Sequence, residues 1–247
     1  MPEQVPVTDR PPVSVCMATY NGAKHIRQQL ASILIQLQPQ DEIIISDDSS
    51  TDDTLSIIAD FKDERIRVFP NNTFRNPIYN FEFALKQAQH EYLFLCDQDD
   101  YWYPHKLDTV TKLLSEHLLV VHDCEVVDIS GKVLHSSFFD YIHLGQGGFF
   151  KNLLKNRYVG CCMAFRRDLL EQSLPFPKSI PMHDWWIGLI AAAKGRVYHC
   201  PDKLIRYIRH SETASNTGAK SQRSMQQKVV IRYFLLKNII IRVLLSR

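Results

Sequence analysis

The sequence lacks several features that would point to common protein classes. It has only nine glycines in 247 residues, and they form neither the G-x-G-x-x-G motif nor a P-loop. This absence argues against a Rossmann dinucleotide site and against a P-loop ATPase. The six cysteines include no C-x-x-C pair, so we expect buried free thiols in a reducing compartment rather than zinc sites or disulfides.

Long apolar runs are also missing. No stretch of 18 or more uncharged apolar residues occurs, so the sequence predicts no spanning helix. Residues 1–12 are polar and rich in proline, without the apolar core of a signal peptide. With 45% hydrophobic and 23% charged residues, the composition is that of a globular protein with one α/β domain or two small ones. We therefore expect a cytoplasmic protein.

Acidic residues are absent after Glu212, although the whole chain has a formal net charge of +2. Seven bases follow that position, so residues 1–212 carry a net −5. An acidic body with a basic, apolar tail indicates that the tail makes a surface contact. On a helical wheel Lys228, Arg232 and Arg242 share an arc of roughly 80°. The tail could pack its apolar residues on the domain, or it could lie on anionic lipid at the cytoplasmic face of a membrane.

Strand and helix patterns alternate along the first half of the chain. Strands are predicted at Val13–Ala18, Glu42–Ser46, Arg65–Phe69 and Glu91–Cys96, with a helical pattern between each pair. This order predicts an α/β fold with a mostly parallel central sheet flanked by helices on both faces. Ligands bind such sheets at the carboxyl ends of the strands.

The second half is less regular. We expect helices at Pro104–Leu114 and Met182–Gly195, the latter with Asp184 as its N-cap. Predicted strands are Leu118–Asp123, Glu125–Ile129, Cys161–Phe165 and Lys203–His210. In the first half, Ser50 and Asp53 resemble a capping box that starts the second helix.

The most informative feature is the run Asp97-Gln98-Asp99-Asp100, which follows the apolar strand Glu91–Cys96. Three acids at one strand end repel one another unless a cation or hydrogen-bond donors neutralise them. Mg²⁺ takes carboxylate oxygens and fills its remaining positions with water and substrate phosphates. The run could also be a solvated acidic turn. Its place at the ligand-binding edge of the sheet favours a metal–diphosphate site of D-x-D type.

Two other polar groups end strands at the same predicted edge, namely Thr19–Asn21 and the pair Asp47-Asp48. The two aspartates are equally consistent with satisfying turn amides and with accepting hydrogen bonds from a pyrimidine imide or a ribose hydroxyl.

His183-Asp184-Trp185-Trp186 is a second polar–aromatic cluster. It could be a capped helix with two core tryptophans. We favour a carboxylate general base beside indoles that form a sugar platform. Since an ordinary aspartate has a pKa near ~3.9, such a base requires partial burial or late proton transfer. Further on, Arg206, Arg209 and His210 are equally consistent with a structural role and with binding a diphosphate or its metal.

Taken together, four segments resemble family 2 glycosyltransferases of the GT-A fold. They are VSVCMATYNG, IIISDDSSTDDTL, FLCDQDDYWYPHKL and MHDWWIGLIAAAKG, in that family's order and within Pro12–Gly218. The pairing of C-D-Q-D-D-x-W with H-D-W-W looks closest to bacterial rhamnosyltransferase-like members that build O-antigen, capsule or related polysaccharides.

The resemblance implies a role for each matching position. Asp184 would be the catalytic base, Asp99 the more direct metal ligand and Asp97 the acid nearer the ribose, while His210 would serve the metal or diphosphate. The nucleotide would be bound by Thr19, Tyr20, Asn21, Asp47, Asp48, Arg75, Asn80, Asp97 and Gln98. The acceptor or sugar would be bound by His183, Trp185, Trp186 and Arg209. The chain departs from the family pattern at Phe74-Arg75, where a glycine is usual, and at Ile208 and Thr213, where arginine and asparagine are usual.

The implied activity is inverting transfer of a sugar to a hydroxyl of a growing, lipid-linked bacterial surface glycan. The donor would be dTDP-rhamnose or a UDP-sugar, and the cofactor Mg²⁺ or Mn²⁺. The implied division is a GT-A domain over 1–218, with a nucleotide-binding half at about 12–100 and an acceptor half at about 101–218, then a basic apolar helix over 219–247. Two alternatives are a sugar-phosphate nucleotidyltransferase, whose glycine-rich first turn is absent, and a catalytically idle glycan-binding scaffold.

Overall fold

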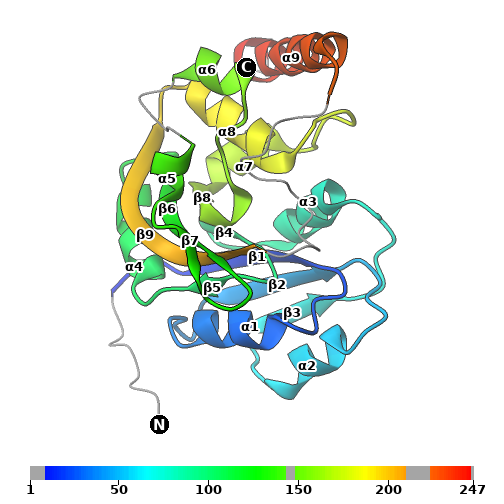
Figure 1. Cartoon of the computed structure of the whole chain (residues 1–247), viewed down its shortest axis with the longest axis vertical. Coiled ribbons are helices and arrows are strands. Elements are labelled where there is room, and N and C mark those ends of the chain that lie inside the picture. The colour runs from blue at the N-terminus through cyan, green and yellow to red at the C-terminus, as the bar shows by residue number, and fades with distance from the viewer. Residues whose placement is uncertain (1–8, 143–147, 210–222, 246–247) are drawn as a thin grey trace.

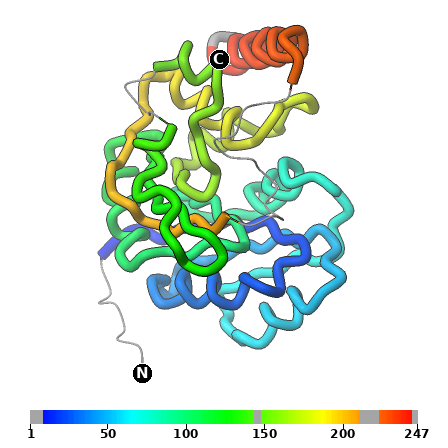
Figure 2. The backbone as a smooth tube through the Cα atoms, in the orientation of Figure 1, coloured from blue at the N-terminus to red at the C-terminus, as the bar shows by residue number. Residues whose placement is uncertain are grey.

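The computed structural model describes residues 9–142, 148–209 and 223–245, shown in Figures 1 and 2. Its first half alternates strands and helices as the sequence predicts. The elements are β1 (Val13–Thr19), α1 (Ile26–Leu34), β2 (Glu42–Asp47), α2 (Thr54–Asp60), β3 (Ile66–Phe69), α3 (Pro77–Gln87) and β4 (Tyr92–Cys96). The four strands pair in parallel, in the order β3-β2-β1-β4. Helices α1 and α2 lie on one side of these strands and α3 on the other (Figure 1).

The second half extends the same sheet with mixed pairing. Its elements are β5 (Tyr101–Trp102), α4 (Lys106–Leu114), β6 (Leu119–Asp128), β7 (Val133–His135), α5 (Phe138–Tyr141), α6 (Phe149–Leu154), a 3₁₀ turn (Gly160–Cys162), β8 (Met163–Arg166), α7 (Arg167–Ser173), α8 (His183–Ala193) and β9 (Val197–Arg209). The order continues as β4-β8-β6-β9-β5, with β7 on β6. Only β6 and β9 pair in parallel here, while β8, β5 and β7 run antiparallel to their neighbours.

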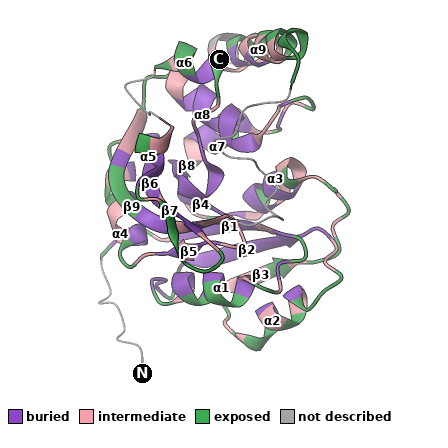
Figure 3. Ribbon diagram, viewed as in Figure 1, coloured by how far each residue is buried: buried purple, intermediate pink, exposed green. Residues whose placement is uncertain are grey.

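The hydrophobic core lies between this sheet and its helices (Figure 3). β1, β2 and β4 are buried along almost their whole length because both faces are covered, which explains their near-continuous apolar sequences. The six cysteines are free and buried, as expected. A parallel sheet brings the carboxyl ends of β1, β2 and β4 to one edge, so the polar residues after these strands gather there.

Three local predictions are corrected by the structure. The two strands expected on either side of Cys124 form the single strand β6, whose register against β9 shifts around Asp123. The shift accommodates the Asp123 carboxylate, which accepts hydrogen bonds from Ser137 Oγ at 2.6 Å and Phe139 N at 2.9 Å. Local irregularities of this kind let a strand carry a buried polar side chain without ending.

The two predicted helix caps also differ. Ser50 donates its hydroxyl hydrogen bond to Asp47 at 2.6 Å, so α2 begins after Asp53 without a side-chain cap. The N-cap of helix α8 lies two residues earlier than expected, at Met182, which leaves Asp184 inside the first turn.

The C-terminal helix α9 (Met225–Ile240), followed by a π-helical turn (Ile241–Leu245), packs on the end of the domain formed by α6 and α8. Leu235 and Ile239 are buried in this contact. Among the residues that the structure describes, no helix combines the length and apolar character that crossing a membrane requires. The predicted boundary at 218 lies outside the described residues, and the division near 100 stays a prediction.

Gly188 shows how tightly α8 is held. A Cβ at this position would lie 2.4 Å from two ring carbons of Tyr158, so the backbone of the helix touches the ring directly. We expect Gly188→Ala to lower the free energy of unfolding by about 1–3 kcal/mol, since overpacking outweighs the gain of about 1 kcal/mol in helix propensity. Chemical denaturation measures the change. Ala193→Gly at the exposed end of the same helix calibrates propensity alone, and a more stable Gly188→Ala protein would contradict the packing argument.

Candidate functional site

A pocket of about 690 Å³ opens at the carboxyl edge of β1, β2 and β4. It is closed on the other side by the start of α3, the segment before β8 and the start of α8. Its lining includes most of the residues predicted for the site, namely Thr19, Tyr20, Asp48, Arg75, Asn80, Asp97, Gln98, Asp99, His183 and Asp184. The sequence signals that were separated by up to 165 positions therefore converge on one cavity.

The turn after β4 supplies the acidic wall of the pocket. Asp97 and Asp99 are partly exposed and line the cavity. Between them, Gln98 accepts a hydrogen bond from Tyr20 N at 2.9 Å and donates one to Tyr20 O at 3.0 Å. These two bonds tie the acidic turn to the turn after β1. The Gln98 side chain also covers Gly22, where a Cβ would lie 2.4 Å from its Oε1.

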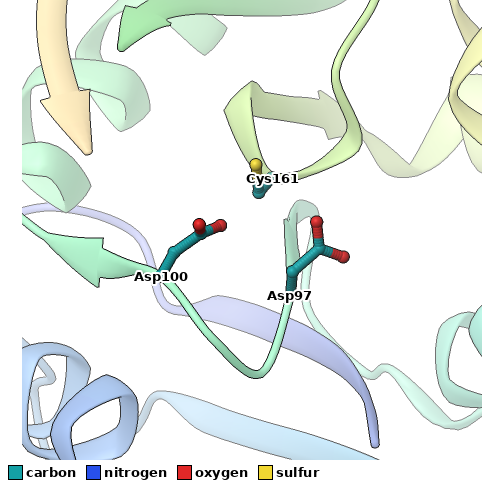
Figure 4. A group of neighbouring side chains, drawn as sticks. All are labelled: Asp97, Asp100 and Cys161. Carbon is teal, nitrogen blue, oxygen red and sulfur yellow. The ribbon is translucent and has the colours of Figure 1, made fainter. Parts of the chain in front are cut away.

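Asp97 and Asp100 point toward Cys161 from the two arms of this turn (Figure 4). Ligand atoms of these three side chains lie within 4.8 Å of one another. Burial, and then the nearby Asp99 and Asp184 carboxylates, raise the pKa of Asp97 to about 7. Burial also raises the pKa of Asp100 well above its usual range, with further contributions from Asp99 and Asp97. Holding all these acids ionised is costly without a cation.

A buried cation lies behind this acidic group. Lys106 is 1% exposed, its Nζ donates to Cys161 O at 3.0 Å, and it stands 3.7 Å from the ring centroid of Trp102. Burial lowers the pKa of Lys106, and Asp100 is among the groups that oppose this effect. Asp100 accepts a bond from Ile208 N at 3.3 Å, while its other oxygen has no hydrogen-bond partner. Asp100 does not line the pocket, so it links the acidic turn to β9 and Lys106 instead of facing a ligand.

Asp47 and Asp48 have different positions, since Asp47 is buried in a turn and Asp48 lines the pocket. Asp47 is fully buried and accepts bonds from Thr19 Oγ1 at 2.7 Å and from Ser50 Oγ and N at 2.6 and 2.9 Å. It does not line the pocket, so the structure gives it the turn-satisfying role rather than the predicted nucleotide contact. Asp48 lines the pocket while accepting bonds from Phe74 N at 2.7 Å and Asn76 N at 3.2 Å, and it shapes the loop before α3.

Three further predicted nucleotide contacts lie at the same edge. Asn80 lines the pocket and binds Ser46 Oγ and Thr19 O. Arg75 is exposed at the rim with a left-handed φ of 49°, where the resemblance predicts a glycine. Asn21, with φ 48°, accepts a bond from Thr51 N at 2.8 Å and does not line the pocket, so it orders the loop after β2.

The first turn of α8 places Asp184 in the pocket opposite the acidic turn. The carboxylate is 8% exposed, and burial raises its pKa to about 7. Its Oδ1 accepts bonds from Trp185 N and from Asn156 Nδ2, the latter at 3.1 Å. These donors and the helix N-terminus favour the charged form, but burial outweighs them and the pKa stays raised. Asp184 therefore has the environment that a general base at neutral pH needs.

His183 lines the pocket beside Asp184. Its ring stacks on Phe81 with centroids 4.3 Å apart, and neither ring nitrogen has a hydrogen-bond partner. Burial lowers the pKa of His183 to about 3, so the ring is neutral at physiological pH. Gly160 makes room for it, because a Cβ there would lie 3.1 Å from His183 Nε2. A buried imidazole with unused nitrogens in a pocket is suited to a hydrogen bond with a ligand.

The two tryptophans after Asp184 do not form a sugar platform. Trp185 is 5% and Trp186 0% exposed, and neither lines the pocket. Their indole Nε1 atoms donate to the carbonyls of Asn152 at 2.7 Å and Ser173 at 3.0 Å. The structure contradicts this part of the prediction because an α-helix turns successive side chains by ~100°, and the two residues after Asp184 thereby face the core.

Two predicted residues lie at the end of β9. Arg209 is half-buried, pairs with Asp128 in register and is not part of the pocket lining. His210 lies outside the described residues. Asn156, Phe81 and Cys161 could not be predicted from the sequence, since no local motif connects them to the acids. Asp100 was within the acidic run, but only the tertiary fold places it beside Lys106.

Comparisons with known proteins agree with this geometry. The family described as "Glycosyl transferase family 2" matches residues 14–174, well over half of the chain. The chain belongs to glycosyltransferase family 2. It is 26% identical to the dTDP-rhamnosyl transferase RfbG of Shigella flexneri, over 83% of this chain and 76% of that protein. It is 24% identical to WfgD of Escherichia coli, a UDP-Glc:alpha-D-GlcNAc-diphosphoundecaprenol beta-1,3-glucosyltransferase, over 93% and 92% of the two chains.

The solved structures show that the fold is of GT-A type. The fragment 1–349 of TarS from S. aureus, in complex with UDP-GlcNAc, superposes with a TM-score of 0.70 at 20% identity. Its match covers 93% of this chain and 66% of that one. The mannosyltransferase PcManGT from Pyrobaculum calidifontis, in complex with GDP-Man and Mn²⁺, has a TM-score of 0.62 at 21% identity, over 97% and 66% of the chains. The predicted α/β GT-A fold with a C-terminal helix is thus confirmed.

The donor set in this glycosyltransferase fits a hard divalent cation. Asp97 and Asp99 present carboxylates to the pocket, and their crowding with Asp100 would be relieved by positive charge. The Cys161 thiol, whose pKa is raised by burial, is a poor partner for such an ion, so the two pocket-facing carboxylates are the residues that would hold it.

The raised pKa of Asp184 has a consequence for stability. Below pH 3.8, the pKa of this carboxyl in the unfolded chain, Asp184 is protonated in both states. Between pH 3.8 and about 7, the folded protein keeps this proton while the unfolded chain releases it. Wild-type stability is therefore lost as the pH rises through this window. Asp184→Asn keeps an Oδ1 acceptor and removes the charge. In metal-free buffer its advantage in unfolding free energy should be about 2 kcal/mol larger at pH 8 than at pH 5.

Urea denaturation at the two pH values measures this difference. Asp140→Asn, at an exposed aspartate of α5, is the matched control and should show little change with pH. An advantage of Asp184→Asn that is equal at both pH values would contradict the buried, proton-binding carboxyl.

Proposed function

We propose that this protein is an inverting, metal-dependent glycosyltransferase that moves a sugar from a nucleoside-diphosphate donor to a hydroxyl of a lipid-linked surface glycan. The observation that carries the proposal is the sharing of one pocket by Asp97 and Asp99 on one side and Asp184 on the other. The first pair suits a diphosphate with its cation. Asp184, on the opposite side, suits proton removal from an acceptor hydroxyl.

The donor is proposed to lie along the carboxyl edge of the sheet. Thr19, Tyr20, Asp48 and Asn80 offer the polar groups there that a base or ribose would contact, with Arg75 and Gln98 at the rim. A volume of about 690 Å³ is typical of a small-molecule site. In support, TarS has been solved with UDP-GlcNAc and with UDP, and PcManGT with GDP-Man. The relative RfbG is a dTDP-rhamnosyl transferase, so a dTDP-sugar or UDP-sugar is our proposed donor.

In a single-displacement reaction, the residues of the pocket would have different roles. Asp184 takes the acceptor proton as the hydroxyl oxygen attacks the anomeric carbon from the side opposite the leaving group, which inverts the configuration. Asn156 and Trp185 N hold the Asp184 carboxylate in place. His183 is proposed to donate or accept a hydrogen bond with the acceptor sugar. When bound, Mg²⁺ or Mn²⁺ would offset negative charge on the departing diphosphate from its place at Asp97 and Asp99.

The acceptor is proposed to be a lipid-linked saccharide at the cytoplasmic face of a membrane. WfgD, which matches over nearly the whole chain, acts by its name on a diphosphoundecaprenol-linked sugar. The two alternatives, a nucleotidyltransferase and an idle scaffold, find no support in the family match or the relatives. Arg209 and His210 remain proposed contacts of the diphosphate or acceptor.

Replacing the proposed base should greatly reduce turnover while leaving nucleotide binding intact. We expect Asp184→Asn to lower kcat by ~10²-fold or more, because an amide cannot accept the proton. Nucleotide affinity should stay near that of the wild type, since Asp184 touches the acceptor side. Release of nucleoside diphosphate from a panel of nucleotide-sugars, with calorimetry for binding, separates the two effects. Wild-type turnover in Asp184→Asn would reject the assignment, and Asp140→Asn controls for the loss of a carboxylate.

The metal assignment predicts a different pattern. Asp99→Ala should weaken Mn²⁺-dependent binding of UDP or dTDP by roughly tenfold or more, while binding measured without metal changes little. Titration calorimetry with and without Mn²⁺ measures both. Asp53→Ala, at an exposed acid just before α2, is the control. Unchanged affinity of Asp99→Ala in the presence of Mn²⁺ would argue against this carboxylate as a ligand.

A further inference from the structure

Helix α9 exposes an apolar face to solvent. Met225, Val229, Val230, Tyr233 and Ile240 project from the side that does not touch the domain, and Tyr233 is 68% and Val229 63% exposed. The outer surface of α9 accordingly contains exposed residues along its whole length (Figure 3). The sequence left two arrangements open for this tail, with its apolar residues packed on the domain or with the helix lying on anionic lipid. Leu235 and Ile239 do pack on the domain, while the residues named above stay exposed.

The structure uses two of those basic residues to hold the helix. Arg232 donates to Leu154 O, and Arg242 donates to the carbonyls of Leu174 and Pro175. Both inward and outward sides of α9 therefore contain large apolar side chains. Large apolar side chains on two sides of a helix normally indicate that both of these sides are covered. The domain covers one side only.

Helix α6 lies beside α9 and extends this surface (Figure 1). Phe150 and Leu154 are 75% and 65% exposed. We call the combined surface the α6–α9 face. It consists of Phe150 and Leu154 from α6 and Met225, Val229, Val230, Tyr233 and Ile240 from α9. Exposed apolar patches built from several neighbouring side chains mark interaction sites.

The charged residues around this face indicate which kind of partner it binds. Lys151 and Lys155 on or next to α6, and Lys237 on α9, are exposed and all carry positive charge. No acid occurs in 148–158 or in 223–245, within the described residues. A second copy of the chain would place like charges together across a two-fold interface. An anionic lipid surface instead pairs each ammonium with phosphate and accepts the apolar side chains among its acyl chains.

We propose that the α6–α9 face docks on an anionic membrane surface. The apolar residues of the face enter the boundary between headgroups and acyl chains, and Lys151, Lys155 and Lys237 contact lipid phosphates. Tyr233 is amphipathic, which suits the headgroup level. The binding is interfacial and parallel to the membrane plane, since α9 is held along its length by the domain.

The same two helices support the catalytic carboxylate. Trp185, which follows Asp184, donates its Nε1 to Asn152 O in α6, and the Arg232 guanidinium of α9 lies 5.6 Å from the Trp185 ring centroid. Asn156, just after α6, donates to Asp184. Docking this face would thus bring a lipid-linked acceptor to the base. This consequence rests on the proposed function, whereas membrane binding itself does not.

Co-sedimentation of the full chain with liposomes tests the proposal. We expect binding to vesicles with about 30% phosphatidylglycerol in phosphatidylcholine, weak binding to phosphatidylcholine alone, and a several-fold loss when salt is raised from about 0.05 to 0.5 M. Val229→Ser with Tyr233→Ser should reduce partitioning by roughly tenfold. Lys151→Glu with Lys155→Glu should reduce binding to anionic vesicles only.

Matched controls come from the β6–β7 hairpin, where Ile129 and Lys132 are also exposed. Ile129→Ser and Lys132→Glu should bind like the wild type. Equal partitioning of the α9 and hairpin variants, or equal binding of neutral and anionic vesicles, would overturn the proposal. So would a dimer in light scattering that Val229→Ser with Tyr233→Ser dissociates, without liposome binding. Donor turnover measured without lipid tests the proposed function separately, and these surface variants should retain it.

Discussion

The central constraint on this structure is the crowding of carboxylates at one end of a buried sheet. Asp97, Asp99 and Asp100 follow the buried strand β4 within four positions, and Asp184 shares the pocket with Asp97 and Asp99. Burial raises the pKa of Asp184 to about 7, and burial together with the nearby Asp99 and Asp184 carboxylates raises the pKa of Asp97 to about 7. Three interactions hold the acidic turn in place in spite of the repulsion between its carboxylates. They are the buried Lys106, the hydrogen bond from Ile208 N to Asp100, and the hydrogen bonds between Gln98 and Tyr20. The site therefore combines crowded carboxylates, which a cation would relieve, with a buried carboxyl of raised pKa, and burying these acids lowers the stability of the fold.

Helix α8 transmits this constraint to the rest of the domain. Its first turn must hold Asp184 away from water, and the packing of Gly188 against Tyr158 and the burial of both tryptophans fix the helix there. The tail contributes to the same support, because Arg232 of α9 reaches both α6 and the Trp185 ring. The C-terminal helix is thus part of the framework of the site as well as a surface element.

Residues that look alike in sequence have different functions for the same physical reason. Asp47 and Asp48 are adjacent, but successive residues at a strand end face opposite sides, so Asp47 satisfies the turn from inside while Asp48 faces the pocket. Asp184 and the tryptophans after it separate similarly around a helix. A motif therefore locates a site more accurately than it assigns its individual members.

Strand and helix order, the parallel first half and the acidic turn after β4 follow from the sequence by itself, because apolar periodicity and the cost of burying charge are local properties. The same reasoning located Asp48, Asp97, Asp99 and Asp184. Only the tertiary structure decided that Trp185 and Trp186 are core residues, that Phe81 lines the pocket while Asn156 binds Asp184, and that Arg232 and Arg242 bond to the domain. These outcomes depend on contacts between segments that are far apart in the chain. The local sequence pattern of one segment does not determine which other segment packs against it.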